Sequence, residues 1–140
     1  MKFRSTVILI LSTSSTAVLA KGINCQGSAD YAGFGFSLAS LSDICNNLCS
    51  HISDTVRQNG YHLAEACNNV KEGLAAFYQG THRGESTRTA CTLCRRLEEH
   101  GCKTCGSAAL VANDINLGGE LTVNTVVGSC NVGYTVNCPS

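Results

Sequence analysis

Residues 91–105 have the sequence CTLCRRLEEHGCKTC, and three features of this stretch underlie a fold prediction for the whole chain. Apolar residues recur at helical spacing, Gly101 interrupts that pattern, and four cysteines form two Cys-x-x-Cys pairs. Glycine directly after the last helical residues is a common helix stop. The stretch therefore predicts a helix that ends at about His100 and is fastened to the rest of the protein through its cysteines.

The first twenty residues have the composition of a secretory signal peptide. Two cations precede a short apolar run, and small residues close on Ala20. Cleavage there leaves residues 21–140 as a single domain, with a short C-terminal extension from about residue 131. No other stretch approaches the roughly 20 apolar residues that a membrane span needs. We therefore predict a secreted, extracellular protein that does not insert into a membrane.

The charge balance changes when the signal peptide is removed. The whole chain has 140 residues, ten lysines and arginines, ten aspartates and glutamates, and a formal net charge of zero. Because Lys2 and Arg4 lie in the signal peptide, the mature part has eight basic and ten acidic side chains and a formal charge of −2. Phosphate binding depends on a clustered basic surface. We therefore expect no nucleic-acid partner.

All the cysteines lie in the mature part, at a density typical of secreted disulfide scaffolds. The paired spacing within residues 91–105 also suits a tetrahedral zinc site, and a redox-active pair is a further alternative. Because thiols oxidise in the secretory pathway, we favour five disulfides over both alternatives and expect no metal and no cofactor. Their pairing cannot be deduced from the sequence. The ten residues are Cys25, Cys45, Cys49, Cys67, Cys91, Cys94, Cys102, Cys105, Cys130 and Cys138.

Two segments predict helices. The first runs from about Ser40 to Gln58, with a capping start and a stop at Asn59-Gly60. The second runs from about Ser86 to His100. The apolar positions of the first are Leu41, Ile44, Cys45, Leu48, Cys49, Ile52 and Val56.

Several short segments predict strands. Extended segments are expected at 22–26, within 61–80 on both sides of a loop, at 102–105, at 120–127 and at 134–137. The residues after Cys105 are assigned to a loop that continues to Gly119. Two helices among short strands predict an α+β fold, with the helices packed on one face of a mostly antiparallel sheet.

One group of residues has the composition of a catalytic site. His82, Arg83 and Glu85 bring a base, a cation and an acid together, as a small secreted hydrolase or ribonuclease requires. A solvated loop has the same composition, and the chain contains no G-x-S-x-G, H-E-x-x-H or phosphate-binding glycine loop. We therefore predict that the protein is not an enzyme. The hydrolase hypothesis requires a cleft that holds His82 and Glu85 together.

Three motifs point to a family. Residues 22–28 are GINCQGS, residues 100–107 are HGCKTCGS, and residues 119–124 are GELTVN. In this order they resemble the family of the smut-fungus viral killer toxin, killer protein four, and its fungus-encoded relatives, over most of residues 22–130. The resemblance implies an α/β sandwich, with a mostly antiparallel sheet of about five strands, two antiparallel helices on one face, and disulfides.

The same resemblance implies a function. The viral toxin inhibits the growth of susceptible fungi by blocking calcium uptake at voltage-gated calcium channels, and it is not an enzyme. We therefore expect a monomeric, secreted killer-toxin-like protein that binds a membrane channel or another surface component of a competing fungus or host cell. The alternative is a non-toxic effector that binds an apoplastic host target.

The chain departs from the toxin in ways that bear on the mechanism. In the toxin a lysine two residues before a loop cysteine carries much of the activity, and Glu65 occupies that position if the cysteine corresponds to Cys67. The toxin is basic, whereas this mature chain is slightly acidic, so its attraction to a negative surface is weaker. Cys94 and the tail through Cys138 lie outside the pattern. The cations that we select as target contacts are Lys71, Arg83 and Arg88.

Overall fold

A computed structural model describes residues 22–27, 40–67, 72–111, 114–127 and 134–137 of the chain. The predicted signal peptide over residues 1–20 lies outside these ranges. So does the predicted C-terminal extension, apart from residues 134–137.

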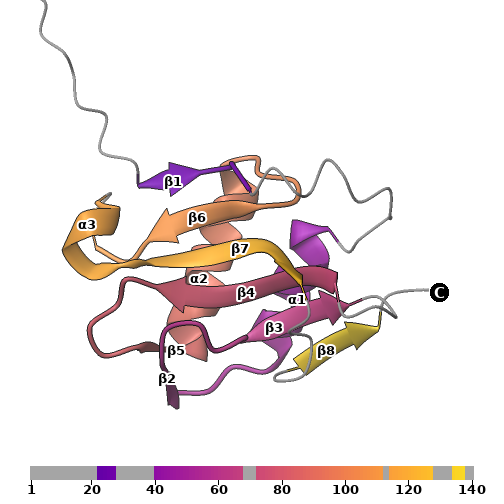
Figure 1. Ribbon diagram of the computed structural model, residues 1–140, viewed down its shortest axis with the longest axis horizontal. Coiled ribbons are helices and arrows are strands. Elements are labelled where there is room, and N and C mark those ends of the chain that lie inside the picture. Colours follow the sequence, from indigo (N-terminus) through magenta and orange to yellow (C-terminus); the bar gives the residue numbers. More distant parts are fainter. Residues whose placement is uncertain (1–21, 28–39, 68–71, 112–113, 128–133, 138–140) are drawn as a thin grey trace, which may run out of the picture.

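The described residues form two layers, a sheet and a pair of helices that covers one of its faces (Figure 1). All neighbouring strands of the sheet are antiparallel except β3 and β8, which run parallel. This arrangement confirms the predicted α+β fold with a mostly antiparallel sheet. In spatial order the six strands are β1 (Ile23–Asn24), β6 (Gly106–Ala109), β7 (Glu120–Val127), β4 (Glu72–Gln79), β3 (Ala64–Cys67) and β8 (Tyr134–Asn137).

The first helix, α1 (Leu41–Ser50), starts where the sequence predicts it. The Ser40 side chain accepts a hydrogen bond from the Asp43 amide, and the Asp43 carboxylate accepts one from the Ser40 amide at 2.8 Å. These two bonds form a capping box, which satisfies amides that the first turn of a helix leaves without partners. The buried residues of the helix are Leu41, Ile44, Cys45 and Leu48.

The predicted end of this helix at about Gln58 is wrong, because α1 ends at Ser50. Ile52 and Val56 continue the helical spacing, but their side chains are 44% and 54% exposed, so helix formation there would bury no core residue. The chain is instead held by the side chain of Thr87, whose hydroxyl accepts a hydrogen bond from the Ser53 amide at 2.7 Å. It then enters β2 (Val56–Arg57), which pairs with β5 (Glu85–Ser86) in a separate two-stranded ribbon.

The second helix, α2 (Thr87–Glu99), confirms its prediction at both ends. Ser86 is the N-cap and accepts a hydrogen bond from the Thr89 amide, and Gly101 adopts a φ of +94° after the last turn. L-residues with side chains rarely adopt that conformation, which explains a glycine at this stop. The buried residues of α2 are Thr87, Ala90, Leu93, Cys94 and Leu97.

Two elements lie in the segment that was predicted to be a loop. The strand β6 has the sequence GSAA, which has no β-branched or aromatic residue, so its local preference for extended structure is weak. Small residues are required there, because a Cβ at Gly106 would lie 2.6 Å from the Asn24 carbonyl oxygen of β1. The strand therefore depends on its pairing with β1 and β7. The second element is a single helical turn, α3 (Ile115–Gly118).

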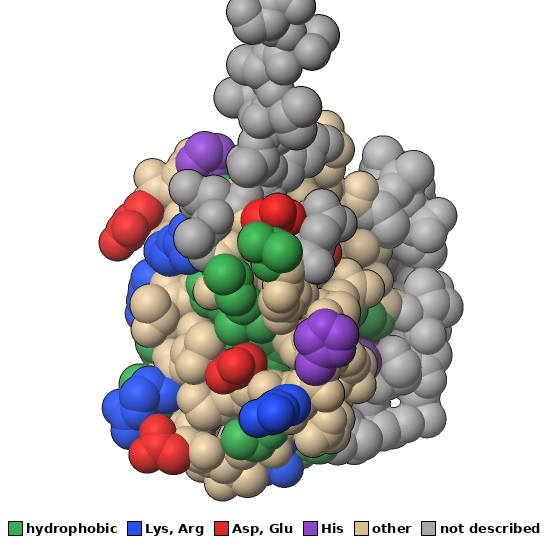
Figure 2. Space-filling model, turned by 90° about the vertical axis from the view of Figure 1, so that its left-hand side faces the viewer, with side chains coloured by type: hydrophobic (Ala, Val, Ile, Leu, Met, Phe, Trp, Pro, Cys, Tyr) green, Lys and Arg blue, Asp and Glu red, His purple; other side chains and the backbone are tan. Residues whose placement is uncertain are grey.

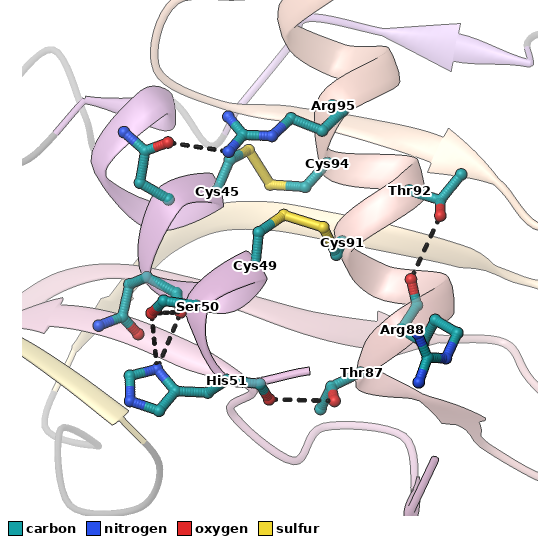
Figure 3. Close-up of a disulfide and its surroundings, with 12 residues drawn as sticks. Cys45, Cys49, Ser50, His51, Thr87, Arg88, Cys91, Thr92, Cys94 and Arg95 are labelled. Carbon is teal, nitrogen blue, oxygen red and sulfur yellow. Dashed lines mark hydrogen bonds between the residues drawn. A yellow bond between two sulfur atoms is a disulfide. The ribbon is translucent and has the colours of Figure 1, made fainter. Parts of the chain in front are cut away.

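Three disulfides are present in the described part. Cys45–Cys94 and Cys49–Cys91 join α1 to α2 (Figure 3). Because the earlier cysteine of α1 pairs with the later cysteine of α2, the two helices run antiparallel. The third, Cys25–Cys102, links the end of β1 to the segment after α2. The zinc interpretation is wrong, because three of its four cysteines, Cys91, Cys94 and Cys102, form disulfides.

The prediction of five disulfides remains untested for the other four cysteines. Cys105 is buried and has no disulfide partner among the described residues, and burial raises the pKa of its thiol. Cys130 and Cys138 lie outside the described residues, as does the side chain of Cys67.

Candidate functional site

An open hollow of about 340 Å³ lies at one end of the sheet. It forms where the β4–β5 loop, the first turn of α2 and the region of α3 come together. Figure 2 shows this face of the molecule, with hydrophobic side chains gathered near its middle and acidic, basic and histidine side chains around them. The lining residues are Thr81, His82, Arg83, Gly84, Glu85, Thr89, Leu110, Val111 and Gly118.

Hydrogen bonds between Asn59 and Thr81 fix the loop that carries the charged residues of the hollow. The Asn59 Nδ2 donates to the Thr81 carbonyl at 2.7 Å, and the Asn59 Oδ1 accepts from both the amide and the hydroxyl of Thr81. The Thr81 hydroxyl also accepts a hydrogen bond from the Gly84 amide at 3.1 Å. Gly84 has a φ of +70°, and a Cβ at this position would overlap the Arg57 carbonyl. The path from His82 to Glu85 is therefore defined by hydrogen bonds and by this glycine.

Glu85 is half-buried and has no ion-pair partner in the described part of the chain. Arg57 lies directly opposite it in the β2–β5 pairing, but the Arg57 guanidinium stacks over the Tyr61 ring at 4.6 Å from the ring centre. Arg83 is exposed, lines the same hollow and forms no ion pair with Glu85 either. The hollow thus contains opposite charges that do not neutralise one another.

Exposed apolar residues flank the hollow. Among the described residues, the large hydrophobic side chains exposed to solvent are those of Ile52, Val56, Val111 and Leu117. Val111 lines the hollow, and Leu117 precedes Gly118 of its lining on α3. Leu117 is 66% exposed, the largest value of the four. Neither residue was predicted from the sequence to be part of a site, although two large apolar residues in a predicted loop are a usable signal.

The structure separates two of the three predicted target contacts. Arg83 lines the hollow, whereas Arg88, on the first turn of α2, does not. The Arg88 guanidinium donates to the Asp54 carboxylate at 2.8 Å, and this hydrogen bond, together with the opposite charge, lowers the pKa of Asp54. Lys71 lies outside the described residues.

His82 and Glu85 both line the hollow, which is the juxtaposition that the hydrolase hypothesis required. Catalysis by a histidine base also requires a nucleophile or an orienting carboxylate within hydrogen-bond reach. Among the described residues, the His82 ring has no hydrogen-bond partner, and the Thr89 hydroxyl of the hollow contacts Ser86 instead. The arrangement fits binding better than catalysis.

Glu65, which occupies the position of the toxin's lysine if the toxin's loop cysteine corresponds to Cys67, is inside the protein. Its side chain is 1% exposed, and its Oε2 lies 2.7 Å from the Nδ1 of His62. The His62 ring in turn packs near Phe77, at 5.9 Å between ring centres. Glu65 therefore contributes to the sheet and is not placed to contact a target.

No group of three or more His, Cys, Asp or Glu side chains in the described part of the chain is placed to hold a metal ion. No helix there has the length and apolar character needed to cross a membrane.

Comparison with known proteins identifies the family. The model of the Kp4 family matches residues 7–127. The chain belongs to the Kp4 family. It is 36% identical over 110 residues to the KP4 killer toxin of Ustilago maydis P4 virus, in an alignment that covers 78% of this chain and 82% of the toxin. The family resemblance predicted from the sequence motifs is confirmed, and the chain is a killer-toxin-like protein.

The extent of the Kp4 match separates two parts of the fold. It includes every element from β1 to β7, and hence all the residues that line the hollow. It ends at Val127, before β8. The strand β8 therefore lies outside the matched Kp4 region.

Proposed function

We propose that this Kp4 protein is secreted and inhibits the growth or calcium uptake of a competing fungus or a host cell by binding a membrane channel or another surface component. The observation that carries the proposal is its 36% identity to a killer toxin over most of both chains. The disulfide between α1 and α2 at Cys45–Cys94 supports action outside the cell, because such bonds persist in oxidising surroundings.

The proposed contact surface is the end of the molecule that carries the hollow and Arg83. It combines a guanidinium, a carboxylate and exposed apolar side chains, and surfaces of this mixed kind bind proteins. Lys71 and Arg88 stay in the proposal as additional cations. Because the mature chain has a formal charge of −2, long-range electrostatic attraction to a negative target contributes less to binding than direct contacts at the surface.

The test uses the oxidised mature protein, residues 21–140, on a panel of fungi and on plant tissue. Growth and calcium uptake should fall at micromolar protein, and added external calcium should restore both. Alanine at Lys71, Arg83 and Arg88 together should weaken the inhibition, whereas Lys103→Ala, at an exposed residue outside the hollow, should not. No effect of the wild-type protein on any cell type contradicts the proposal.

A non-toxic effector is the second candidate function. The burial of Glu65 favours it, since this position offers no surface cation here and is that of the toxin's active lysine if the toxin's loop cysteine corresponds to Cys67. Expression confined to host colonisation, together with normal growth of all treated fungi, distinguishes this candidate from a toxin.

A further inference from the structure

We propose that the hollow binds a lysine or arginine side chain, presented by an exposed segment of the partner protein, with its charged end at Glu85 and a neighbouring apolar side chain on Val111 and Leu117. This inference rests on the proposed function only in taking that partner to be the target. It assigns a binding role to Glu85 and to the apolar rim, beyond the cations selected from the sequence.

Among the described residues, two nearby cations leave the Glu85 carboxylate without an ion-pair partner. Arg57 is its cross-strand partner and Arg83 is two residues away, so either would be an obvious partner for an ion pair. Neither forms one: the Arg57 guanidinium lies over the Tyr61 ring, and no ion pair joins Arg83 to Glu85. A half-buried carboxylate without a partner has lost part of its hydration, and a cation from outside compensates that loss.

Glu85 lies beside the buried core. The hydroxyl of Tyr78, which is fully buried, donates to the carbonyl of Ser86, the residue after Glu85, at 2.7 Å. Because Glu85 also lines the hollow, it lies at the boundary between the hollow and the core. A ligand must enter the hollow to reach it, and a long side chain can do so.

The apolar lining of the hollow also favours a long cationic side chain. Lysine and arginine side chains lay their methylene stems along apolar surface while the charged end reaches a polar group. Leu110 and Val111 provide such a surface within the hollow, and Leu117 extends it over α3. An isolated small amine would leave this outer apolar surface uncovered, whereas a protein segment covers it.

Arg83 and His82 line the same hollow and would attract an acidic ligand. Both are exposed to solvent, where water and salt screen their charges, whereas Glu85 is half-buried. The less screened charge decides the sign of the preferred ligand, so we infer a cationic one. An acidic ligand is an outcome that the experiment must distinguish.

The experiment titrates the ¹⁵N-labelled, oxidised mature protein with four capped dipeptides and follows its amide resonances. Acetyl-Leu-Lys-amide carries both proposed features, acetyl-Leu-norleucine-amide lacks the charge, acetyl-Gly-Lys-amide lacks the apolar neighbour, and acetyl-Leu-Glu-amide reverses the charge. Acetyl-Leu-Lys-amide should cause saturable shifts at Gly84, Glu85, Thr89 and Val111. The uncharged and acidic peptides should bind about tenfold more weakly, and the glycine peptide measurably more weakly.

Three variants assign the contacts. Glu85→Gln should weaken binding of acetyl-Leu-Lys-amide about tenfold, while Glu99→Gln, at an exposed residue outside the hollow, should leave it unchanged. Arg83→Ala should strengthen binding of this dipeptide, which offers Arg83 no acidic group, because the substitution removes a like charge from the hollow; toward the whole target, which Arg83 contacts in the proposed function, the same substitution should weaken binding. An unchanged amide spectrum away from the loop verifies that each variant is folded.

Several results would overturn the inference. Equal binding of the charged and uncharged peptides, tighter binding of the acidic peptide, or unchanged binding by Glu85→Gln would each do so. Failure of the proposed function is a separate result. If the dipeptide binds but the protein has no effect on cells, the hollow is still assigned as a binding site for a cationic side chain. Conversely, if the wild-type protein inhibits growth and Glu85→Gln inhibits equally, the hollow is not the target contact.

Discussion

The helix layer and the end of the molecule that carries the hollow are held together by different means. Two disulfides join α1 to α2, whereas among the described residues the β4–β5 loop is tied to the rest of the protein by hydrogen bonds, chiefly those between Asn59 and Thr81. The covalent links thus lie in the scaffold, and the candidate binding surface is held by hydrogen bonds. Loops on a rigid scaffold commonly carry function in this way, because they can change without unfolding the core.

The largest expected effect concerns the disulfides between α1 and α2. Replacing Cys45 and Cys94 with alanine should lower the free energy of unfolding by about 2–4 kcal/mol, because the bridge restrains the unfolded chain and both cysteines are fully buried. The corresponding Cys49/Cys91 variant should lose less, because those residues are half-buried. Denaturant unfolding of both variants, with the other bridges intact, measures the two values. A larger loss for Cys49/Cys91 contradicts this ranking.

A smaller effect is expected at the hydrogen-bonded end. Asn59→Ala removes three hydrogen bonds to Thr81 and should lower the free energy of unfolding by about 1–2 kcal/mol. Hydrogen exchange should become faster at the Thr81 and Gly84 amides and remain unchanged in the middle of α2. The matched control is Gln58→Ala, which removes one longer bond of 3.3 Å to the Arg83 carbonyl. Equal effects of the two substitutions would show that the Asn59 contacts do not hold the loop.

The smallest effect concerns the exposed pair between Arg88 and Asp54, which links the first turn of α2 to the loop before β2. Arg88→Ala should raise the pKa of Asp54 toward its ordinary value of 3.8, as measured by carboxyl NMR titration. Since the folded pKa is the lower one, any stabilisation by the pair is present above 3.8 and is lost as the pH falls through the folded value. Arg95→Ala, whose guanidinium bonds Glu98 and Asn46 instead, should leave the Asp54 titration unchanged.

The helices show what local sequence can and cannot predict. The bounds of α2 follow from Ser86, from a continuous apolar stripe and from Gly101, all of which act within a few residues. The end of α1 was misplaced because Ile52 and Val56 keep the helical spacing, and only a distant contact, from Ser53 to Thr87, shows why the chain leaves the helix. Periodicity predicts burial correctly only where another element lies opposite.

Only the part of the candidate site that is local in the sequence was predicted. His82, Arg83 and Glu85 are close in sequence, so their charged cluster was visible without a structure. Val111 and Leu117 come from a segment about thirty residues later, and strand β6 brings that segment to the hollow through pairing with β7. The sequence GSAA of β6 gives no strand signal, so the sequence did not show that this segment reaches the hollow.

The parallel strand β8 has a consequence for the sheet edge. It pairs with β3 from Ala64 to Cys67 and lies beyond the Kp4 match, which ends at Val127. Without β8, the outer side of β3 would present a row of unpaired backbone groups, and such edges promote association between copies of a chain. The strand β8 therefore pairs the backbone groups along this side of β3, and it is itself the outermost strand at this end of the sheet.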